Sequence, residues 1–173
     1  MFSGWGLSWG GWLDNRRGEW WLVAQLSLIS AHLLPAWPSA ASWGMAAWPR
    51  SLSVAGTLIL LSGFLLALQA FLGLGTSLSP LPTPKDGNRL VCSGPYSRSR
   101  HPLYQAVLIC SCGVTIAIGS LLHLLLGLVL AAVLRGKAKW EEQALKVLHP
   151  DYAAYQASTP AIVPGIAPLD WRE

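Results

Sequence analysis

Residues 103–134 read LYQAVLICSCGVTIAIGSLLHLLLGLVLAAVL, and this stretch decides the fold. It contains no Asp, Glu, Lys or Arg, and the pair Gly119-Ser120 divides it into two apolar segments, 103–118 and 121–134. A connection this short joins helices that are antiparallel neighbours. The stretch therefore predicts a tight antiparallel hairpin of two helices at membrane depth.

Two further apolar segments precede this hairpin, at residues 20–35 and 52–74. The second is long enough to cross a hydrocarbon core of about 30 Å. The whole chain is 53% apolar and 12% charged, which is unlike a soluble domain, and it holds ten tryptophans, a residue that favours membrane interfaces. We expect an all-α fold, a polytopic membrane helix bundle of about four transmembrane helices.

The basic residues are distributed unevenly around these segments. Eleven of the twelve would lie on one side of a four-span bundle: Arg16, Arg17, Lys85, Arg89, Arg98, Arg100, Arg135, Lys137, Lys139, Lys146 and Arg172. Only Arg50 would lie on the other. Cytoplasmic loops carry the excess of Lys and Arg, so both termini and residues 75–101 are predicted to be cytoplasmic. The basic residues form no continuous face, which favours lipid headgroups over nucleic acid as partner; the oligomeric state stays open.

The chain shows no second domain and no internal repeat. We expect one integral membrane domain over residues 1–173, made of a Trp-rich segment (1–19), two spans (20–74) and a region from 75 to 164 that contains the hairpin. Pro80, Pro82 and Pro84 make residues 76–88 irregular. Residues 135–149 are predicted to continue the last span as a charged cytoplasmic C-terminal helix that ends at Pro150.

A polar cluster, GPYSRSRHPLY at residues 94–104, leads directly into the hairpin. Pro102 suits the first position of a helix, and the preceding backbone amides are then expected to be free to bind an anion. Arg100 can grip an anion bidentately, while His101 and Tyr104 offer hydrogen bonds. The alternative is a purely interfacial role, with arginines reaching headgroups and tyrosines in an aromatic belt.

A second polar group follows the hairpin. Lys137, Glu141 and Glu142 emerge from the last span, and the hairpin should bring the two glutamates within reach of Arg100. Cationic and anionic groups that converge in this way suit a zwitterionic ligand. The alternative is a solvated helix face on which Lys137 pairs with Glu141 and Glu142 pairs with Lys146.

The sequence gives no indication of a metal site. No HExxH or CxxC spacing occurs, and Cys92, Cys110 and Cys112 are interpreted as small membrane-embedded residues. His32 and His123 lie near the opposite ends of their spans, where we expect each to satisfy its own hydrogen bonds rather than bind a ligand.

Over residues 75–164 the chain resembles the superfamily of isoprenylcysteine carboxyl methyltransferases and phospholipid methyltransferases, which are integral membrane enzymes. The matching elements, in order, are Leu90-Val91, Gly94-x-Tyr96, Arg100-His101-Pro102-x-Tyr104, Glu141-Glu142-x-x-Leu145, Tyr152-x-x-Tyr155 and Pro164. The resemblance implies S-adenosylmethionine as cofactor. It also implies that the cofactor is bound by Leu90, Val91, Tyr96, His101, Pro102, Leu103, Tyr104 and Glu141.

The resemblance further implies a methyltransferase. We expect Arg100, His101 and Glu141 at the reaction and Arg135, Lys137 and Glu142 at the acceptor. Carboxyl-methylating members have an arginine at the position of Lys137, and lysine offers a point charge in place of a planar fork. The expected acceptor is therefore a lipidic or amphipathic molecule that enters from the bilayer. The group that receives the methyl is a carboxylate, an amine or a hydroxyl. The rival hypothesis is a non-catalytic membrane scaffold or small permease subunit that retains the fold.

Overall fold

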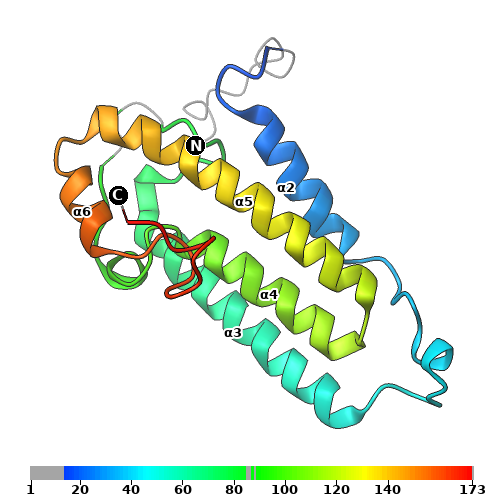
Figure 1. Cartoon of the computed structure of the whole chain (residues 1–173). Helices are drawn as coiled ribbons and strands as arrows, with labels where there is room; N and C mark the ends of the chain where they lie inside the picture. Colours follow the sequence, from blue (N-terminus) through cyan, green and yellow to red (C-terminus); the bar gives the residue numbers. More distant parts are fainter. Residues whose placement is uncertain (1–13, 85–86, 88, 173) are drawn as a thin grey trace.

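A computed structural model describes residues 14–84, 87 and 89–172, and within them every regular element is helical. Four longer helices, α2 (Glu19–Ala31), α3 (Arg50–Leu74), α4 (Pro102–Ile118) and α5 (Leu121–Leu148), lie side by side in the order α2, α5, α4, α3 (Figure 1). The shorter elements are the helix α6 (Tyr152–Ser158) and the 3₁₀ turns η1 (Ala40–Trp43), η2 (Gly75–Ser77) and η3 (Gly94–Ser97). The predicted all-α class is confirmed. Lys85 and most of the Trp-rich segment 1–19 lie outside the described residues.

The predicted hairpin is present between α4 and α5. Gly119 ends α4 in the left-handed conformation, at φ +62°, and its N–H donates to the carbonyl of Thr115. The Ser120 side chain accepts from the backbone N–H of His123 at the start of α5. A Cβ on Gly119 would lie 2.4 Å from the Trp48 ring, so both conformation and space require glycine at this turn.

The helices α3 and α4 approach each other closely through glycines. A Cβ on Gly56 would lie 2.2 Å from the backbone nitrogen of Ala117, and one on Gly113 would lie 2.5 Å from that of Leu60. Small residues allow helix backbones to approach in this way, which is how membrane helices associate. This contact makes α3 and α4 the most closely packed helix pair of the bundle.

The lengths of the helices differ from the predicted spans. Among the described helices, α3 and α5 are long and apolar enough to cross a membrane. The first predicted span, residues 20–35, forms the 13-residue helix α2, which at 1.5 Å per residue is only about 20 Å long. Because α2 ends at Ala31 in a turn through His32, its expected end at residue 35 is wrong. The 17 residues of α4 reach about 25 Å.

The end of the bundle where α4 turns into α5 is closed by polar contacts. His32 Nε2 lies 2.7 Å from Ser111 Oγ, and His123 Nδ1 lies 2.7 Å from Ser120 Oγ. The indole N–H of Trp48 donates to the carbonyl of Ile116. Both histidines therefore satisfy their hydrogen bonds within the protein, as expected.

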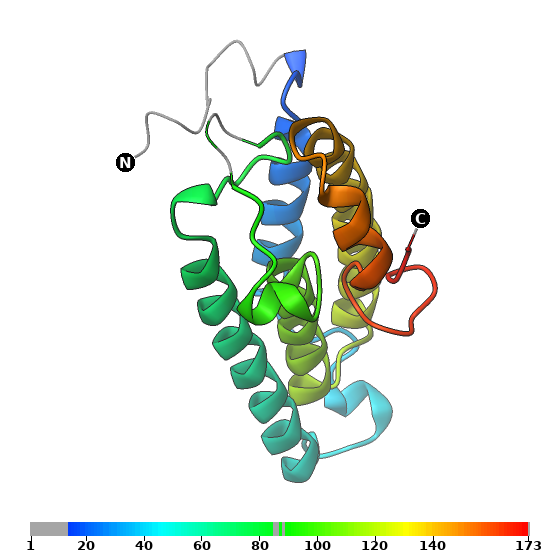
Figure 2. The same ribbon diagram turned by 90° about the vertical axis from the view of Figure 1, so that its left-hand side faces the viewer.

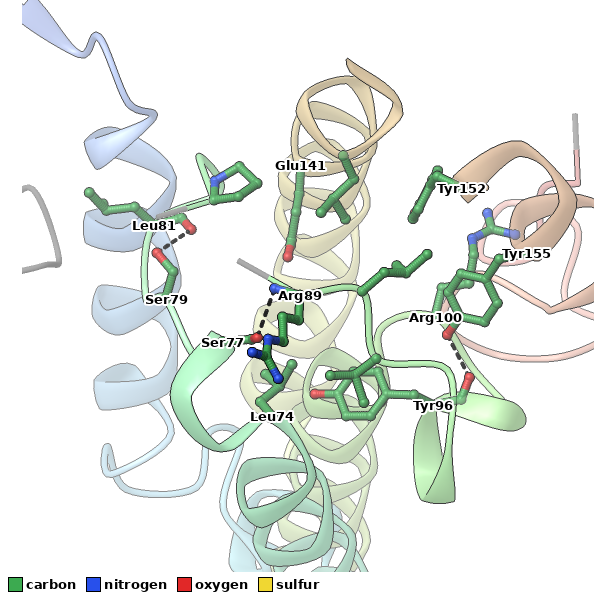
Figure 3. A pocket seen from close by; sticks show the side chains of 14 residues that line it. Leu74, Ser77, Ser79, Leu81, Arg89, Tyr96, Arg100, Glu141, Tyr152 and Tyr155 are labelled. Atoms are coloured by element: carbon green, nitrogen blue, oxygen red, sulfur yellow. Dashed lines mark hydrogen bonds between the residues drawn. The ribbon is translucent and has the colours of Figure 1, made fainter. Parts of the chain in front are cut away.

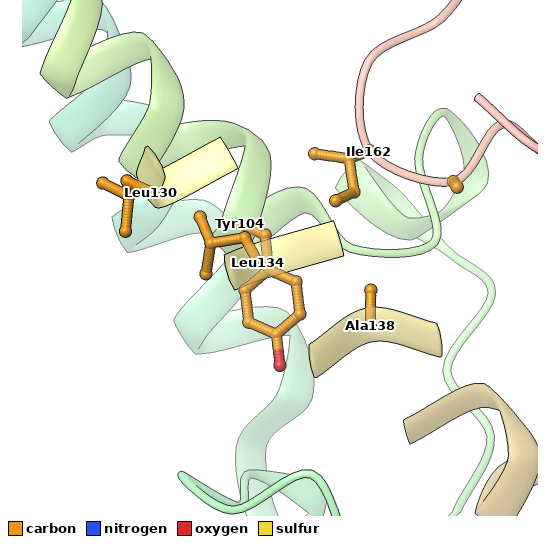
Figure 4. Close-up of a cluster of buried hydrophobic side chains, with 6 residues drawn as sticks. Tyr104, Leu130, Leu134, Ala138 and Ile162 are labelled. Carbon is orange, nitrogen blue, oxygen red and sulfur yellow. The ribbon is translucent and has the colours of Figure 1, made fainter. Parts of the chain in front are cut away.

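The opposite end, which we call the α6 end, is where the chain folds back on itself. Helix α5 continues without interruption past Leu134, as predicted, and α6 and the C-terminal segment then return along it (Figure 2). Ala161 and Ile162 of that segment are fully buried against α4 and α5 (Figure 4). The core cluster here consists of Tyr104, Leu130, Leu134, Ala138, Ala161 and Ile162. The C-terminal segment is thus part of the core that carries the polar cluster.

Candidate active site

Arg100 is a buried hub at the α6 end, with a fully buried side chain. Its Nε–H donates to Glu142 Oε1 at 2.8 Å, and Nη1 donates to the carbonyls of Gln156, at 2.8 Å, and Thr159. Nη2 donates to the carbonyl of Trp171 at 2.7 Å. Four of the five guanidinium N–H groups are therefore used within the protein, which leaves Arg100 little capacity to grip a ligand bidentately.

The backbone amides before α4 are also occupied. The N–H of Arg100 donates to the carbonyl of Pro160 at 2.8 Å, and the N–H of His101 donates to that of Ala161 at 2.9 Å. The expectation that these amides are free to bind an anion is wrong. The C-terminal segment lies against them and supplies the acceptors. Pro102 is the first residue of α4, as predicted.

Glu142 is buried and fully engaged. Its Oε1 accepts from Arg100 and lies 3.0 Å from His101 Nε2, and its Oε2 accepts from the indole N–H of Trp171 at 2.7 Å. Since a carboxylate only accepts, Nε2 carries the proton in the contact with His101. The alternative in which Glu142 pairs with Lys146 on a solvated face is wrong, because burial against Arg100 gives this carboxylate a stronger set of donors.

Glu141 points in a different direction, since successive helix residues project about 100° apart. Its Oε2 accepts from the hydroxyl of Tyr104 at 2.8 Å and lies 3.7 Å from His101 Nδ1. The rings of His101 and Tyr104 are stacked, with centroids 5.2 Å apart and planes within 1°. His101 thus lies between the two carboxylates, with one nitrogen facing each.

A cleft opens beside Glu141 at the α6 end (Figure 3). It contains about 560 Å³ of space, part of it open to solvent. Its lining combines apolar side chains with hydroxyls and charged groups. The lining residues include Leu74, Ser77, Ser79, Arg89, Leu90, Val91, Tyr96, Glu141, Leu145, Tyr152 and Tyr155.

Two tyrosines fix the wall of this cleft. The Tyr96 hydroxyl donates to the carbonyl of Ala70 at 3.4 Å, and the Tyr155 hydroxyl donates to the carbonyl of Tyr96. Burial raises the pKa of Tyr96, and the negative charge of Glu141 raises it further. Burial likewise raises the pKa of Tyr155. Both phenols therefore remain neutral hydrogen-bond donors at physiological pH.

A second cavity, which we call the helix chamber, lies between the ends of α2, α3, α4 and α5. It contains about 820 Å³ of space, part of it open, and is lined mainly by apolar side chains. Its polar lining comes from Gln25, Ser79, Tyr96, Arg100, His101, Tyr104, Lys137 and Glu141. The cleft and the helix chamber share Leu74, Ser79, Tyr96, Arg100 and Glu141, so they adjoin along a wall that contains Glu141.

Lys137 in the helix chamber is buried and held by neutral groups. Its ammonium donates to Gln25 Oε1 at 2.7 Å and to the carbonyl of Pro80 at 3.0 Å. It also lies over the ring of Tyr104, 5.3 Å from the centroid. The alternative in which Lys137 pairs with Glu141 on a solvated face is wrong, because the ammonium points towards α2 instead.

The structure brings most of the predicted site residues together. Leu90, Val91, Tyr96 and Glu141 line the cleft, and His101, Leu103, Tyr104, Lys137 and Glu141 line the helix chamber. Arg135 is exposed on α5 and lines neither cavity, and Glu142 and the buried Pro102 lie behind the walls.

The sequence reasoning missed other residues of the site. Arg89 had been used only to assign topology, and Gln25 had no signal because α2 matches no motif. Trp171 lies beyond the last motif, Pro164. A lone tryptophan after a proline-ended segment was the only available indication that the chain folds back at this point.

Comparisons with known proteins identify related sequences. The sequence model of a family described as phospholipid methyltransferase matches residues 52–151, more than half of the chain. The cobalt-zinc-cadmium resistance protein CzcN of Cupriavidus metallidurans is 35% identical over 88 residues. That match covers 48% of this chain and 39% of CzcN, so the chain spans well under half of that relative's length.

Proposed function

Because the chain belongs to the phospholipid methyltransferase family, whose membership implies a membrane methyltransferase, we propose that it transfers a methyl group from S-adenosylmethionine to a lipidic or amphipathic acceptor. The observation that carries this proposal is the shared wall between the cleft and the helix chamber, which contains Glu141. Two adjoining sites, a cleft of mixed polarity and a more apolar chamber, suit a transfer between a polar donor and a lipidic acceptor.

The cleft fits the proposed cofactor chemically. Leu90, Val91 and Leu145 offer apolar surface for the adenine, and Glu141 offers a carboxylate for hydroxyl, ammonium or sulfonium groups. The carboxylate of the cofactor needs a cation. Because the donors of Arg100 are used within the protein, we assign this role to Arg89, an exposed cation on the cleft wall.

The helix chamber is proposed as the acceptor site. Its apolar lining suits a chain that enters sideways from the bilayer between helices, and Lys137 supplies the only cation of its described lining besides Arg100. The hydrogen-bond partners of this buried ammonium are neutral, and the charge of Glu141, which lies beyond ion-pair distance, compensates it only in part. Lys137 is therefore the residue that we assign to the polar end of the acceptor. Arg135, which is exposed on α5, would at most meet lipid headgroups.

The residues of the shared wall would orient the methyl donor and the acceptor rather than activate the methyl group. S-adenosylmethionine supplies a methyl group already activated by its sulfonium. Glu141 and Tyr104, joined by a hydrogen bond, hold the wall between donor and acceptor. His101 is held by Glu142, and its second nitrogen faces Glu141. Orientation of donor and acceptor would then contribute most of the rate. An amine or hydroxyl acceptor also loses a proton, and His101 with Glu141 is the group placed to receive it.

The same proposal includes a topology. We assign four membrane crossings in a single integral domain, with both termini and residues 75–101 in the cytoplasm, because basic residues gather at the α6 end. The short helices α2 and α4 require the tryptophans and polar groups at their ends to complete each crossing. The cleft would then open to the cytoplasm, where the cofactor is made.

Calorimetric titration of the purified protein in detergent tests the proposal. We expect saturable binding of S-adenosylmethionine, and His101→Ala combined with Glu141→Ala should abolish it. Arg98→Ala, an exposed arginine in the same segment, is the control and should bind normally. Wild-type protein that binds no cofactor at millimolar concentration would favour the non-catalytic scaffold or permease subunit instead.

A further inference from the structure

Trp171 makes a set of contacts that the proposed reaction does not use. Its indole N–H donates to Glu142 Oε2 at 2.7 Å, and its carbonyl accepts from Arg100 Nη2 at 2.7 Å. Its ring also lies beneath two cations, at 5.8 Å from the guanidinium carbon of Arg100 and 5.5 Å from the ammonium of Lys139. The C-terminal segment is therefore fastened to the same buried ion pair that supports His101.

Trp171 does not line the cleft or the helix chamber. It lies on the other side of Glu142, and it also lies outside residues 52–151, where the family sequence model matches. Any effect on the ligand must pass through the residues between them. The connection runs from Trp171 to Glu142 and from Glu142 to His101. It continues from His101 Nδ1 to Glu141 Oε2, 3.7 Å away, and Glu141 lines the cleft that is proposed to hold the cofactor.

We propose that Trp171 is a positioning residue that holds Glu142, and through it His101, in the orientation that cofactor binding requires. This inference rests on the proposed function for the identity of the ligand. The C-terminal segment then contributes to cofactor binding through Trp171, although the family resemblance ends before this residue.

The geometry gives the physical reason. Glu142 Oε2 has one short donor, the Trp171 indole; its other partner, Gln156 Nε2, is 3.5 Å away. Loss of the indole N–H leaves a buried carboxylate oxygen poorly satisfied, and such an oxygen reorients to find another donor. Any rotation of Glu142 also moves Oε1, which is the acceptor for His101 Nε2. The imidazole then loses the contact that fixes its plane against Tyr104.

The substitution Trp171→Phe removes the indole N–H together with part of the ring, while it retains an aromatic ring near Arg100 and Lys139. We expect the Kd for S-adenosylmethionine, measured by calorimetry on the full chain, to rise about tenfold. Trp43→Phe is the matched control. Trp43 is 56% exposed in η1, near the opposite end of the bundle, and its variant should bind as the wild type does.

A double-mutant cycle distinguishes positioning through Glu142 from a general structural role. In a Glu142→Gln background the partner of the indole is already changed, so Trp171→Phe should alter the Kd less than twofold. If Glu142→Gln does not fold, Glu142→Asp serves, since the shorter side chain withdraws from the indole. Thermal melting of every variant shows that it is folded at the temperature of the titration.

The outcomes separate this inference from the proposed function. Wild-type protein that binds no cofactor overturns the proposed function, and with it the ligand assigned here. Wild-type binding that Trp171→Phe leaves within twofold overturns the role of Trp171 alone. An equal loss of affinity in the wild-type and Glu142-substituted backgrounds also overturns it, because Trp171 would then act by another route.

Discussion

Replacement of Arg100 by alanine should destabilise the fold as well as impair cofactor binding. Arg100 joins three parts of the chain at one point: Glu142 on α5, the carbonyls at the end of α6, and the carbonyl of Trp171. Removing the guanidinium leaves Glu142 as a buried carboxylate without its cation. It also leaves three carbonyls without their donor.

The expected loss of stability follows from the buried ion pair of Arg100 and Glu142. Breaking a buried ion pair by removing one partner costs about 3–5 kcal/mol. A loss of 1 kcal/mol lowers the Tm of a domain of this size by about 2–4 °C, so Arg100→Ala should lower Tm by roughly 10 °C. Arg100→Lys retains the charge but places its donors at one point, and it should recover about half of the loss.

Thermal unfolding of the purified protein in one detergent, followed by circular dichroism, measures this effect. Arg98→Ala is the matched control, because Arg98 is exposed two residues earlier and should change Tm by less than 2 °C. An Arg100→Ala variant that melts within 2 °C of the wild type would refute the reasoning. Arg100 would then be free to serve the ligand, as the sequence alone had suggested.

Two further predictions concern the bundle and the helix chamber. Gly113→Val should weaken the contact of α4 with α3 by about 3 kcal/mol, because even a Cβ there would lie 2.5 Å from the Leu60 backbone. Thermal melting would measure this loss, with Cys112→Ala at an exposed position as the control. An unchanged Tm for Gly113→Val would contradict the prediction. Lys137→Met should leave the Kd for S-adenosylmethionine within twofold and reduce methyl transfer at least tenfold, with Lys137→Arg less affected. Equal loss of binding and transfer would instead place Lys137 in the cofactor site.

Much of the fold follows from the sequence because its determinants are local. The hairpin depends on Gly119-Ser120 between two apolar runs, and the long α5 depends on an unbroken helical pattern past Leu134. The end of α2 was less predictable. The apolar residues Leu33 and Leu34 extend the hydrophobic signal, but the chain turns at His32, whose ring bonds Ser111 on α4. A tertiary contact of this kind leaves no trace in the local pattern.

Some features of the candidate site could likewise be predicted from the sequence, and others could not. Motif spacing brought His101, Tyr104 and Glu141 together correctly, since a hairpin fixes which helix ends are neighbours. The contact of Arg100 with Glu142 follows from the hairpin, as predicted. The other partners of Arg100 could not be predicted, because they come from residues 156–171, which fold back over the site. From the sequence we assigned Glu141 to the cofactor and Glu142 to the acceptor, but the sequence could not show which groups each carboxylate contacts. Their different directions became meaningful only once the structure showed what lies on each side of α5.

The most direct test of the account is methyl transfer itself. Purified protein would be incubated with S-adenosylmethionine labelled in its methyl group and with membranes or lipid extract, and the label would be followed into the organic phase. We predict label in an amphipathic acceptor with the wild type and at least a hundredfold less with Glu141→Ala. Wild-type protein that binds the cofactor but transfers no label to any membrane component would contradict the account.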